Sequence, residues 1–257
     1  MTALSPGLRT LARPVSFLGD VLVSGSTALG GRWQFRLKDF VRVLADCSGR
    51  AVPIVLVVNS LVGAILAFVG AVQLAKFGAG IFVADLVGIA VVREMAAIIT
   101  AVVIAGRTGA AFAAELATMQ ANEEIDALEV LGLSAIDFLV LPRVAALLLM
   151  MPLLYVFACV AGLAGGMTVS TIMLDVSATA YLLRTNDALA APHLLLGVTK
   201  AVVFGVLIGM VSCFHGLRAS RDAEGVGIAT TAAVVSSIVG IIVLDAVFAL
   251  CANALEV

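Results

Sequence analysis

Charged residues interrupt the long apolar runs of this 257-residue chain. Arg93 and Glu94 lie within the apolar stretch 81–104, and Asp245 lies within the stretch 232–251. An ionised side chain in hydrocarbon costs from about 2.5 kcal/mol upward, so such residues tend to face a bundle interior or a cavity. Neighbouring helical residues point about 100° apart, so Arg93 and Glu94 cannot make the same contact. Two roles fit: a structural ion pair, for instance Arg93 with Asp245, or a polar group that faces a cavity.

A second charged group stands between two apolar runs, in a short acidic segment. Its pattern predicts a helix at about 120–132, with one apolar stripe flanked by carboxylates. The stripe and the acids are Ile125, Leu128 and Leu131 with Glu123, Glu124, Asp126 and Glu129. No Lys or Arg occurs between Arg107 and Arg143, so these acids have no basic neighbour in the sequence. Such a helix fits a groove on a basic partner, and a solvated connector is the alternative interpretation.

The chain lacks the motifs of a self-contained enzyme. It has no GxxxxGK[ST] loop, and none of its three lysines lies in a Gly-rich phosphate-binding loop. It also has no GxSxG, no HExxH and no His-paired nucleophile. Its 4 Cys and 2 His show no metal-ligand spacing. We therefore expect no catalytic, nucleotide, cofactor or metal site, and a net charge of -2 without a long basic run gives no sign of nucleic-acid binding.

The composition places these charged residues in a membrane domain. Hydrophobic residues make up 62% of the chain and charged residues 12%, against about 45–50% and about 25% in soluble domains. Since a membrane-crossing helix needs about 20 apolar residues, we predict an all-α integral membrane protein with about five spans. Gly162 and Gly166, four residues apart in the third span, are spaced for close helix packing. The expected spans are about 52–73, 81–104, 144–171, 194–214 and 232–251, within one domain at 52–257.

An amphipathic helix is expected before the first span, in residues 31–50. Its apolar residues recur at helical spacing on one face, with the basic residues largely elsewhere. This pattern favours a helix lying in the membrane interface, with Trp33 and Phe40 as anchors, over an ordinary surface helix. Residues 1–51 therefore form a cytoplasmic N-terminus with an interfacial helix. A polar stretch between the third and fourth spans is expected to fold into small helices at the membrane surface.

Basic residues orient the spans, because cytoplasmic loops are enriched in Lys and Arg. With the N-terminus inside, the outer segments hold only Lys76 and Arg184, and Asp85 and Lys200 fall nearer the outer boundary. The acidic segment then lies in the cytoplasm and the C-terminus lies outside. The basic residues of the inner segments are Arg9, Arg13, Arg32, Arg36, Lys38, Arg42, Arg50, Arg107, Arg143, Arg218 and Arg221.

Residues 92–143 resemble the MlaE/YrbE permease family of ABC-type lipid transporters, which is associated with MCE proteins. The resemblance rests on VREMAAIITAVVIAGRTGAAFAAELATMQANEEIDALEVLGL followed by LVLPR, and LDAVF at 244–248 is also similar. EEIDALEVLG after AGRTGAAFAAEL is far more specific than any GxxxG motif. The chain departs from the family at 95–97, where Gly-Pro is frequent, and at Gln120 and Glu124, where a basic residue and Gln are frequent.

The resemblance implies a permease domain at 52–257 that works as a homodimer. Two cytoplasmic ABC ATPase subunits would bind the dimer and carry ATP and Mg, with the segment 123–129 as coupling helix. An MCE-domain periplasmic protein would accept or deliver lipid, and a STAS-domain protein is a further candidate partner. The implied location is the bacterial inner membrane, with a cytoplasmic N-terminus, a periplasmic C-terminus and a role in outer membrane lipid asymmetry.

Glu94 matches the cavity-facing glutamate of the family. Val69, Gln73 and Phe77 are further expected cavity residues, chosen by their location alone. The expected function is that of a permease that moves lipid, with phospholipid as the expected class. An ion- or proton-coupled secondary transporter using Glu94 and Asp245 is the alternative, and inverted repeats or broken helices would favour it. A structural scaffold and an intramembrane enzyme rank lower.

Overall fold

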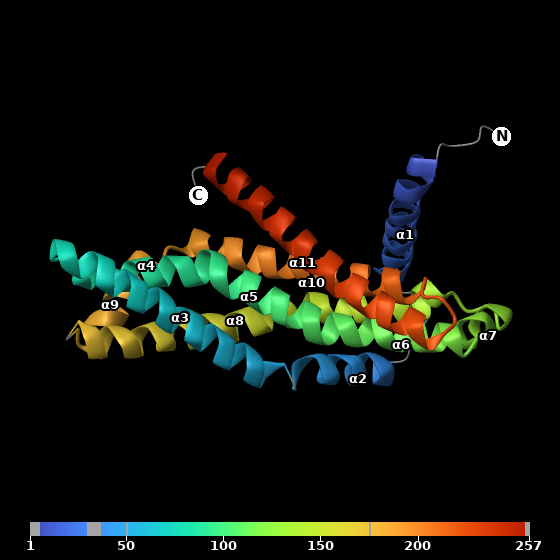
Figure 1. The fold of residues 1–257 in the computed structure, drawn as a ribbon, viewed down its shortest axis with the longest axis horizontal. Helices are drawn as coiled ribbons and strands as arrows, with labels where there is room; N and C mark the ends of the chain where they lie inside the picture. The colour runs from blue at the N-terminus through green and yellow to red at the C-terminus, as the bar shows by residue number, and fades with distance from the viewer. Residues whose placement is uncertain (1–5, 30–36, 50, 175, 255–257) are drawn as a thin grey trace. The chain divides into compact units, whose positions relative to one another are not determined.

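The computed structural model describes residues 6–29, 37–49, 51–174 and 176–254, and this part of the chain contains helices but no strand. Two short 3₁₀ turns, η1 (Ala75–Phe77) and η2 (Gly80–Phe82), and three π-helical turns, η3 (Val91–Met95), η4 (Ala105–Gly109) and η5 (Ile136–Val140), join some of the α-helices. The α-helices (Figure 1) are α1 (Pro6–Leu29), α2 (Leu37–Ser48), α3 (Val52–Leu74), α4 (Val83–Ala90), α5 (Ala96–Ile104), α6 (Ala110–Ala121), α7 (Glu124–Val130), α8 (Leu141–Met173), α9 (Ala178–Ala188), α10 (Ala191–Gly216) and α11 (Ala223–Ala254).

In the part of the chain that the structure describes, five helical stretches are long and apolar enough to cross a membrane. This finding confirms the predicted all-α, multi-pass membrane class. Each stretch contains one of the expected spans and extends beyond both of its ends, because a helix keeps its backbone hydrogen bonds after the apolar run has ended. The stretches are Phe40–Phe77, Gly80–Ala121, Ile136–Met173, Ala191–Gly216 and Ala223–Ala254.

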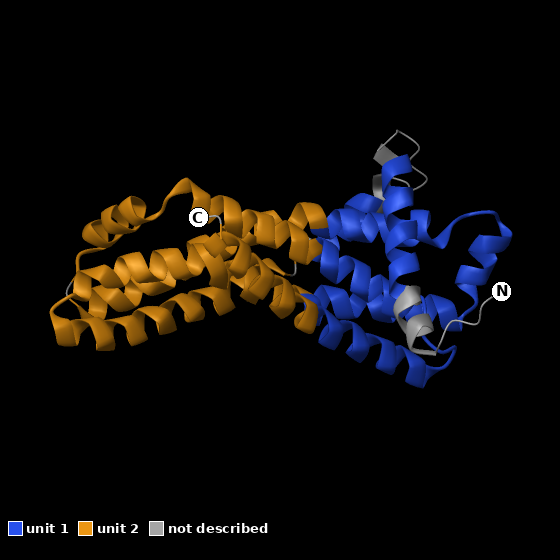
Figure 2. Ribbon diagram, turned by 90° about the horizontal axis from the view of Figure 1, so that it is seen from above, with its two compact units in different colours: residues 1–47, 105–147, 206–237 blue, residues 48–104, 148–205, 238–257 orange. Residues whose placement is uncertain are grey.

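The contacts within the chain define two compact units (Figure 2). Unit 1 comprises residues 1–47, 105–147 and 206–237, and unit 2 comprises residues 48–104, 148–205 and 238–257. The long helices α8, α10 and α11 each contribute residues to both units. The acidic helix α7 belongs to unit 1, and the intramembrane charges Arg93, Glu94 and Asp245 belong to unit 2.

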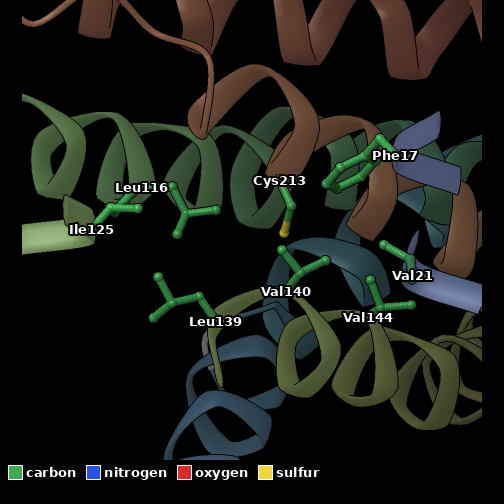
Figure 3. Packing of buried hydrophobic residues seen from close by; sticks show 8 residues of the cluster. All are labelled: Phe17, Val21, Leu116, Ile125, Leu139, Val140, Val144 and Cys213. Carbon is green, nitrogen blue, oxygen red and sulfur yellow. The ribbon is translucent and has the colours of Figure 1, made fainter. Parts of the chain in front are cut away.

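The core of unit 1 gathers buried side chains from helices far apart in the sequence (Figure 3). Helix α1, which the sequence analysis did not predict, contributes Phe17 and Val21 to this core. These residues are four apart and therefore share one face of α1, although Asp20 interrupts the apolar run between them. The other residues of the cluster are Leu116, Ile125, Leu139, Val140, Val144 and Cys213.

In unit 2, helices α3 and α8 pack backbone against backbone. A Cβ atom on Gly63 would lie 1.9 Å from the carbonyl oxygen of Gly162, and one on Gly165 would lie 2.0 Å from that of Ser60. Small residues permit such an approach, which is the main means of close helix packing in lipid. The structure also confirms close packing at Gly162 and Gly166, where a Cβ would lie 2.7 Å from the Val91 and Val87 side chains respectively.

Helix α9 is the small helix expected in the polar stretch between the third and fourth spans. Ser177 caps its start by accepting a hydrogen bond from the Ala180 amide at 3.2 Å. Arg184 fastens it to α4, because its guanidinium contacts the Asp85 carboxylate at 3.1 Å and lies 4.6 Å from the Phe82 ring centroid. The placement of α9 at a membrane surface stays a prediction.

Helix α2 covers the part of the predicted interfacial helix that the structure describes. Phe40 is partly buried there, whereas Trp33 lies outside the described residues. Cys47, near the end of α2, is buried. The interfacial role of α2 stays a prediction.

Candidate functional site

A buried cluster of charges lies within unit 2, centred on Lys200 of α10. The ammonium Nζ donates a hydrogen bond to Oδ1 of Asp245 in α11 at 2.8 Å. It also donates to Oε2 of Glu94 in η3. On the other side of Glu94, the Arg93 Nε atom lies 3.5 Å from Oε1. The cluster thus joins η3, α10 and α11 through two basic and two acidic side chains, whose formal charges cancel.

A hydroxyl group of α8 forms a hydrogen bond with the helical turn that carries Glu94. Residues Val91–Met95 form a π-helical turn, a rare geometry that often occurs at functional sites. The Tyr155 hydroxyl donates to the Val92 carbonyl oxygen at 2.7 Å. Gly197 of α10 leaves room for this contact, since a Cβ there would lie 2.2 Å from the Tyr155 oxygen. Lys200 follows Gly197 by three residues, which places it on the same side of α10.

The side chains of the cluster differ in how far they are exposed to solvent, and this difference indicates different roles. The Lys200 side chain is 0% exposed, whereas those of Glu94 and Asp245 are 26% and 19% exposed. A buried ammonium needs close carboxylates, because an unpaired charge in a low dielectric is strongly unfavourable. The carboxylates remain accessible on their outer sides, where water or a polar headgroup can reach them. The arrangement therefore allows polar binding at Glu94 while Lys200 serves as a fixed counterion.

The structure corrects the suggested ion pair between Arg93 and Asp245. Asp245 is bound to Lys200, and Arg93 is instead beside Glu94. Sequence reasoning had placed Lys200 nearer the outer boundary and gave it no role in this cluster. Lys200 is nevertheless the only Lys or Arg in the predicted fourth span, 194–214. An isolated cation in a span requires an acidic partner, so this signal could have identified the site.

The other expected cavity residues lie on the exposed side of unit 2. Val69 and Gln73 belong to α3, and Phe77 ends η1; all three are exposed. They are spaced at four-residue intervals and, with Leu61 and Ile65 of α3, form an exposed stripe that turns gradually around the helix and is apolar except at Gln73. The single chain leaves this apolar stripe uncovered. Their role as cavity residues stays a prediction.

The acidic helix α7 presents a different face outward than its sequence suggested. Ile125 is buried in the unit 1 core, and Leu128 packs against the same cluster. Two of the three stripe residues, Ile125 and Leu128, therefore pack α7 onto its own chain, which corrects for them the interpretation that the stripe faces a partner. The outward apolar residues are Val130 and Leu131, which are 88% and 74% exposed. Glu129 beside them is exposed and has no ion-pair partner among the described residues.

Two of the acids in this segment have a basic partner after all. Arg221, in the connection between α10 and α11, contacts Asp126 at 2.7 Å and Glu123 at 3.6 Å. Glu123 has a φ of 59°, and a non-glycine residue in this left-handed region stores about 1–3 kcal/mol of strain. The strained turn separates α6 from α7 and lets Glu123 reach Arg221. The expectation that these acids are unpaired is corrected for Glu123 and Asp126.

Arg143, the last residue of the LVLPR motif, joins α8 to α6 in the same unit. Its guanidinium is 2.9 Å from the Glu115 carboxylate and donates to the Leu139 carbonyl oxygen at 2.7 Å. It also lies 5.6 Å from the Phe112 ring centroid. Sequence analysis assigned Arg143 no contact. In the structure its contacts hold together α6 and α8, the helices before and after α7 in the chain.

These features define an all-α, multi-pass membrane protein whose spans carry an internal ion cluster and whose polar connection carries a short acidic helix. Residues 40–251 match the family described as Permease MlaE, and the chain belongs to this family. It is accordingly a transmembrane permease of the ABC-transporter type.

Three relatives illustrate the similarity. The "Probable ABC transporter permease protein RP096" of Rickettsia prowazekii is 36% identical over 203 residues, which cover 79% of this chain and 78% of the relative. The "Probable ABC transporter permease protein slr1045" of Synechocystis sp. is 37% identical over 190 residues, or 74% and 72% of the two chains. The "Protein TRIGALACTOSYLDIACYLGLYCEROL 1, chloroplastic" of Arabidopsis thaliana is 37% identical over 173 residues, or 67% and 49%.

Proposed function

We propose that this chain is the membrane permease of an ATP-driven lipid transporter, with phospholipid as substrate. Two copies form the lipid cavity, and ATP and Mg bind to separate ATPase subunits that dock on α7. The observation that carries the proposal is the structure of α7. One side is packed into the unit 1 core, and the other presents Glu129, Val130 and Leu131. The family, and a relative whose name contains a galactosylated diacylglycerol, support a lipid substrate.

The packing of α7 provides a route for mechanical coupling. When the ATPases close on ATP, they displace the helix that is docked on them. Ile125 and Leu128 transmit this displacement to Leu116 and Leu139, because tightly packed side chains cannot be compressed. Arg143 keeps α6 and α8 together during the movement. The spans then reshape the cavity around the bound lipid.

In the proposed cavity the lipid headgroup lies near Glu94 and the acyl chains lie along the apolar stripe of α3. Glu94 suits this role because its carboxylate is partly exposed while its counterion Lys200 is buried. The stripe that contains Val69 and Phe77 suits it because it is apolar and uncovered in the single chain. A second copy of the chain would enclose this stripe.

The proposed location is the bacterial inner membrane, with α7 and the N-terminus in the cytoplasm and the C-terminus in the periplasm. The distribution of Lys and Arg among the connecting segments supports this orientation. An MCE-domain protein on the periplasmic side would exchange lipid with the cavity, and a STAS-domain protein would bind the ATPase. Both partners are proposed from the family resemblance.

Changing the outward face of α7 is expected to uncouple the ATPase. The triple variant Glu129→Lys, Val130→Asp and Leu131→Asp should reduce co-purified ATPase at least about tenfold, since it places unpaired charges in the interface and reverses the charge at position 129. These residues are exposed, so the fold should persist. The measurement is the stoichiometry of ATPase to permease after affinity purification, together with ATP hydrolysis in nanodiscs.

Helix α9 offers a matched control for this variant. Asp187→Lys with Leu182→Asp and Leu183→Asp makes the same changes of residue type at exposed positions of another polar connection. This control should keep the ATPase bound. A wild-type complex and wild-type hydrolysis in the α7 variant would exclude α7 as the coupling element.

Removing the Glu94 charge is expected to change the bound lipid. Glu94→Gln keeps an oxygen that can accept from Lys200 but loses the anionic site, so the lipid retained per permease should fall several-fold. Native mass spectrometry of the purified permease measures this load. Asp85→Asn is the matched control, because Asp85 pairs with Arg184 outside the cluster. An unchanged load would exclude Glu94 as a headgroup contact, and gradient-driven transport without any ATPase would favour the ion-coupled alternative.

A further inference from the structure

An apolar groove lies between α1 and α10 in unit 1. Its volume is 300 Å³, which is at the lower end of the range for ligand sites. Phe17 and Leu18 of α1 form one wall; Met210, Phe214 and His215 of α10 form the other, and Ser236 of α11 also lines it. All lining residues belong to unit 1, whereas the charge cluster around Lys200 belongs to unit 2. The groove is therefore separate from the cluster.

One turn of α1 packs against the core of unit 1 and also lines the groove. The Phe17 ring meets the Phe214 ring edge to face, with centroids 5.5 Å apart, and Figure 3 shows Phe17 near Cys213 of α10. Val21, one turn later, enters the same core. The opposite side of α1 stays uncovered, and Val15 on it is 66% exposed. Because the exposed side of α1 is apolar next to a membrane-crossing helix, hydrocarbon is the surrounding that suits it.

A positive charge stands at one end of the groove. Helix α10 ends at Gly216, directly after the groove residue His215, and the Arg218 guanidinium lies 4.4 Å from the Phe214 ring centroid. Arg218 is exposed and has no carboxylate within ion-pair distance among the described residues. The neighbouring Arg221, by contrast, is neutralised by Asp126 and Glu123. Arg218 thus supplies an uncompensated cation at the level where the apolar helix ends.

The nearest acid in this connection, Asp222, is engaged elsewhere. Its Oδ1 atom accepts hydrogen bonds from the Ser220 hydroxyl and the Gly225 amide, both at 2.8 Å. The hydrogen bond from Ser220 has the larger effect and that from Gly225 adds to it, and together they hold the pKa of Asp222 below its usual value. Asp222 therefore caps the start of α11 as a carboxylate and leaves Arg218 available for another anion.

We propose that the groove binds one acyl chain of an anionic phospholipid, whose phosphate lies at Arg218 and His215. An acyl chain suits a narrow apolar groove that opens to the bilayer, and basic sites at the ends of membrane helices bind anionic headgroups. The bound lipid fills the space between α1 and α10 and stabilises the docking of α1. Because α1 shares its core with Ile125 of α7, this lipid also stabilises the unit that carries the coupling helix.

The test places a fluorescent probe in the groove. Trp33 is the only tryptophan of the chain, so Trp33→Phe provides a silent background for Leu18→Trp. The full-length permease is reconstituted in nanodiscs containing equal fractions of bromo-acyl phosphatidylglycerol or bromo-acyl phosphatidylcholine. Quenching of the Trp at position 18 should be at least twofold stronger with the anionic lipid. Arg218→Ala should remove this preference, and Ser236→Phe, which narrows the groove, should reduce quenching by both lipids.

Val15→Trp in the same background is the matched control, because Val15 lies on the exposed side of α1. This probe should show equal quenching by the two lipids. Equal quenching at position 18 would overturn the proposal, and so would the absence of quenching there, which would mean that protein fills the groove. Both readouts are independent of ATP hydrolysis and of transport, so the result does not depend on the proposed function.

Discussion

Replacing Lys200 with methionine is expected to cost the permease about 3–5 kcal/mol of stability, the usual effect of removing one partner from a buried ion pair. The Lys200 side chain is 0% exposed and its ammonium binds both Glu94 and Asp245. Without it, the carboxylates of Glu94 and Asp245 lose the cation that they share, and Arg93 is the one cation that the described residues still place beside them. The thermal midpoint in detergent should fall by about 10 °C, at about 2–4 °C per kcal/mol.

Two further variants distinguish the loss of charge balance from the loss of packing. In the double variant Lys200→Met and Asp245→Asn, Arg93 and Glu94 remain as an ion pair and the site carries no net charge, so most of the stability should return. Lys76→Met, at an exposed lysine of η1, should leave the midpoint unchanged. An unaltered midpoint in Lys200→Met alone would show that the cluster does not hold unit 2 together. A stable double variant that fails to transport lipid would assign the charges of Lys200 and Asp245 a role in transport itself.

Replacing Gly63 with alanine is the second change expected to have a large effect. The new Cβ would lie 1.9 Å from the carbonyl oxygen of Gly162, and this obstacle is backbone, which no rotamer change can move. Helices α3 and α8 must separate, at a cost of about 3 kcal/mol, the upper end of the usual range for overpacking. The fraction of monodisperse protein in size-exclusion chromatography and the thermal midpoint should both fall.

Gly227 of α11 provides the control for this substitution, because a Cβ there meets nothing within 4 Å. Gly227→Ala should raise stability slightly, since alanine favours a helix by up to about 1 kcal/mol over glycine. The two variants therefore shift the midpoint in opposite directions. Equal midpoints for Gly63→Ala and Gly227→Ala would mean that α3 and α8 do not pack closely in the membrane.

The acidic segment shows what a local sequence pattern can and cannot predict. Its periodicity correctly indicated a short helix, observed as α7 (Glu124–Val130). The same periodicity could not predict whether the apolar stripe faces a partner protein or the core of its own chain. Both surroundings favour the same apolar residue types. The partner of Asp126 was equally hidden, since Arg221 lies in a connection that only the folding of α10 and α11 brings back to α7.

Helix α1 was missed for a related reason. Its inner stripe of Phe17 and Val21 is short, and Asp20 lies between the two residues in the sequence. Among the side chains of α1 that the structure describes, these two are the buried ones, so the inner stripe is too short to indicate a helix from the sequence. Phe17 and Val21 matter because they pack in a core that includes residues of α10. Those residues of α10 lie almost 200 positions further along the chain.

The sequence by itself determined the membrane class, the five apolar spans, the acidic helix and the family. These properties follow from local composition and motif, because a chain in hydrocarbon must satisfy its backbone hydrogen bonds within each helix. Only the tertiary structure decided that Lys200 joins Glu94 to Asp245, that Ile125 faces inward and that α1 borders a groove. Such contacts depend on the rotation and register of each helix, which are fixed by packing between segments far apart in the chain, as at the glycine contacts of α3 and α8.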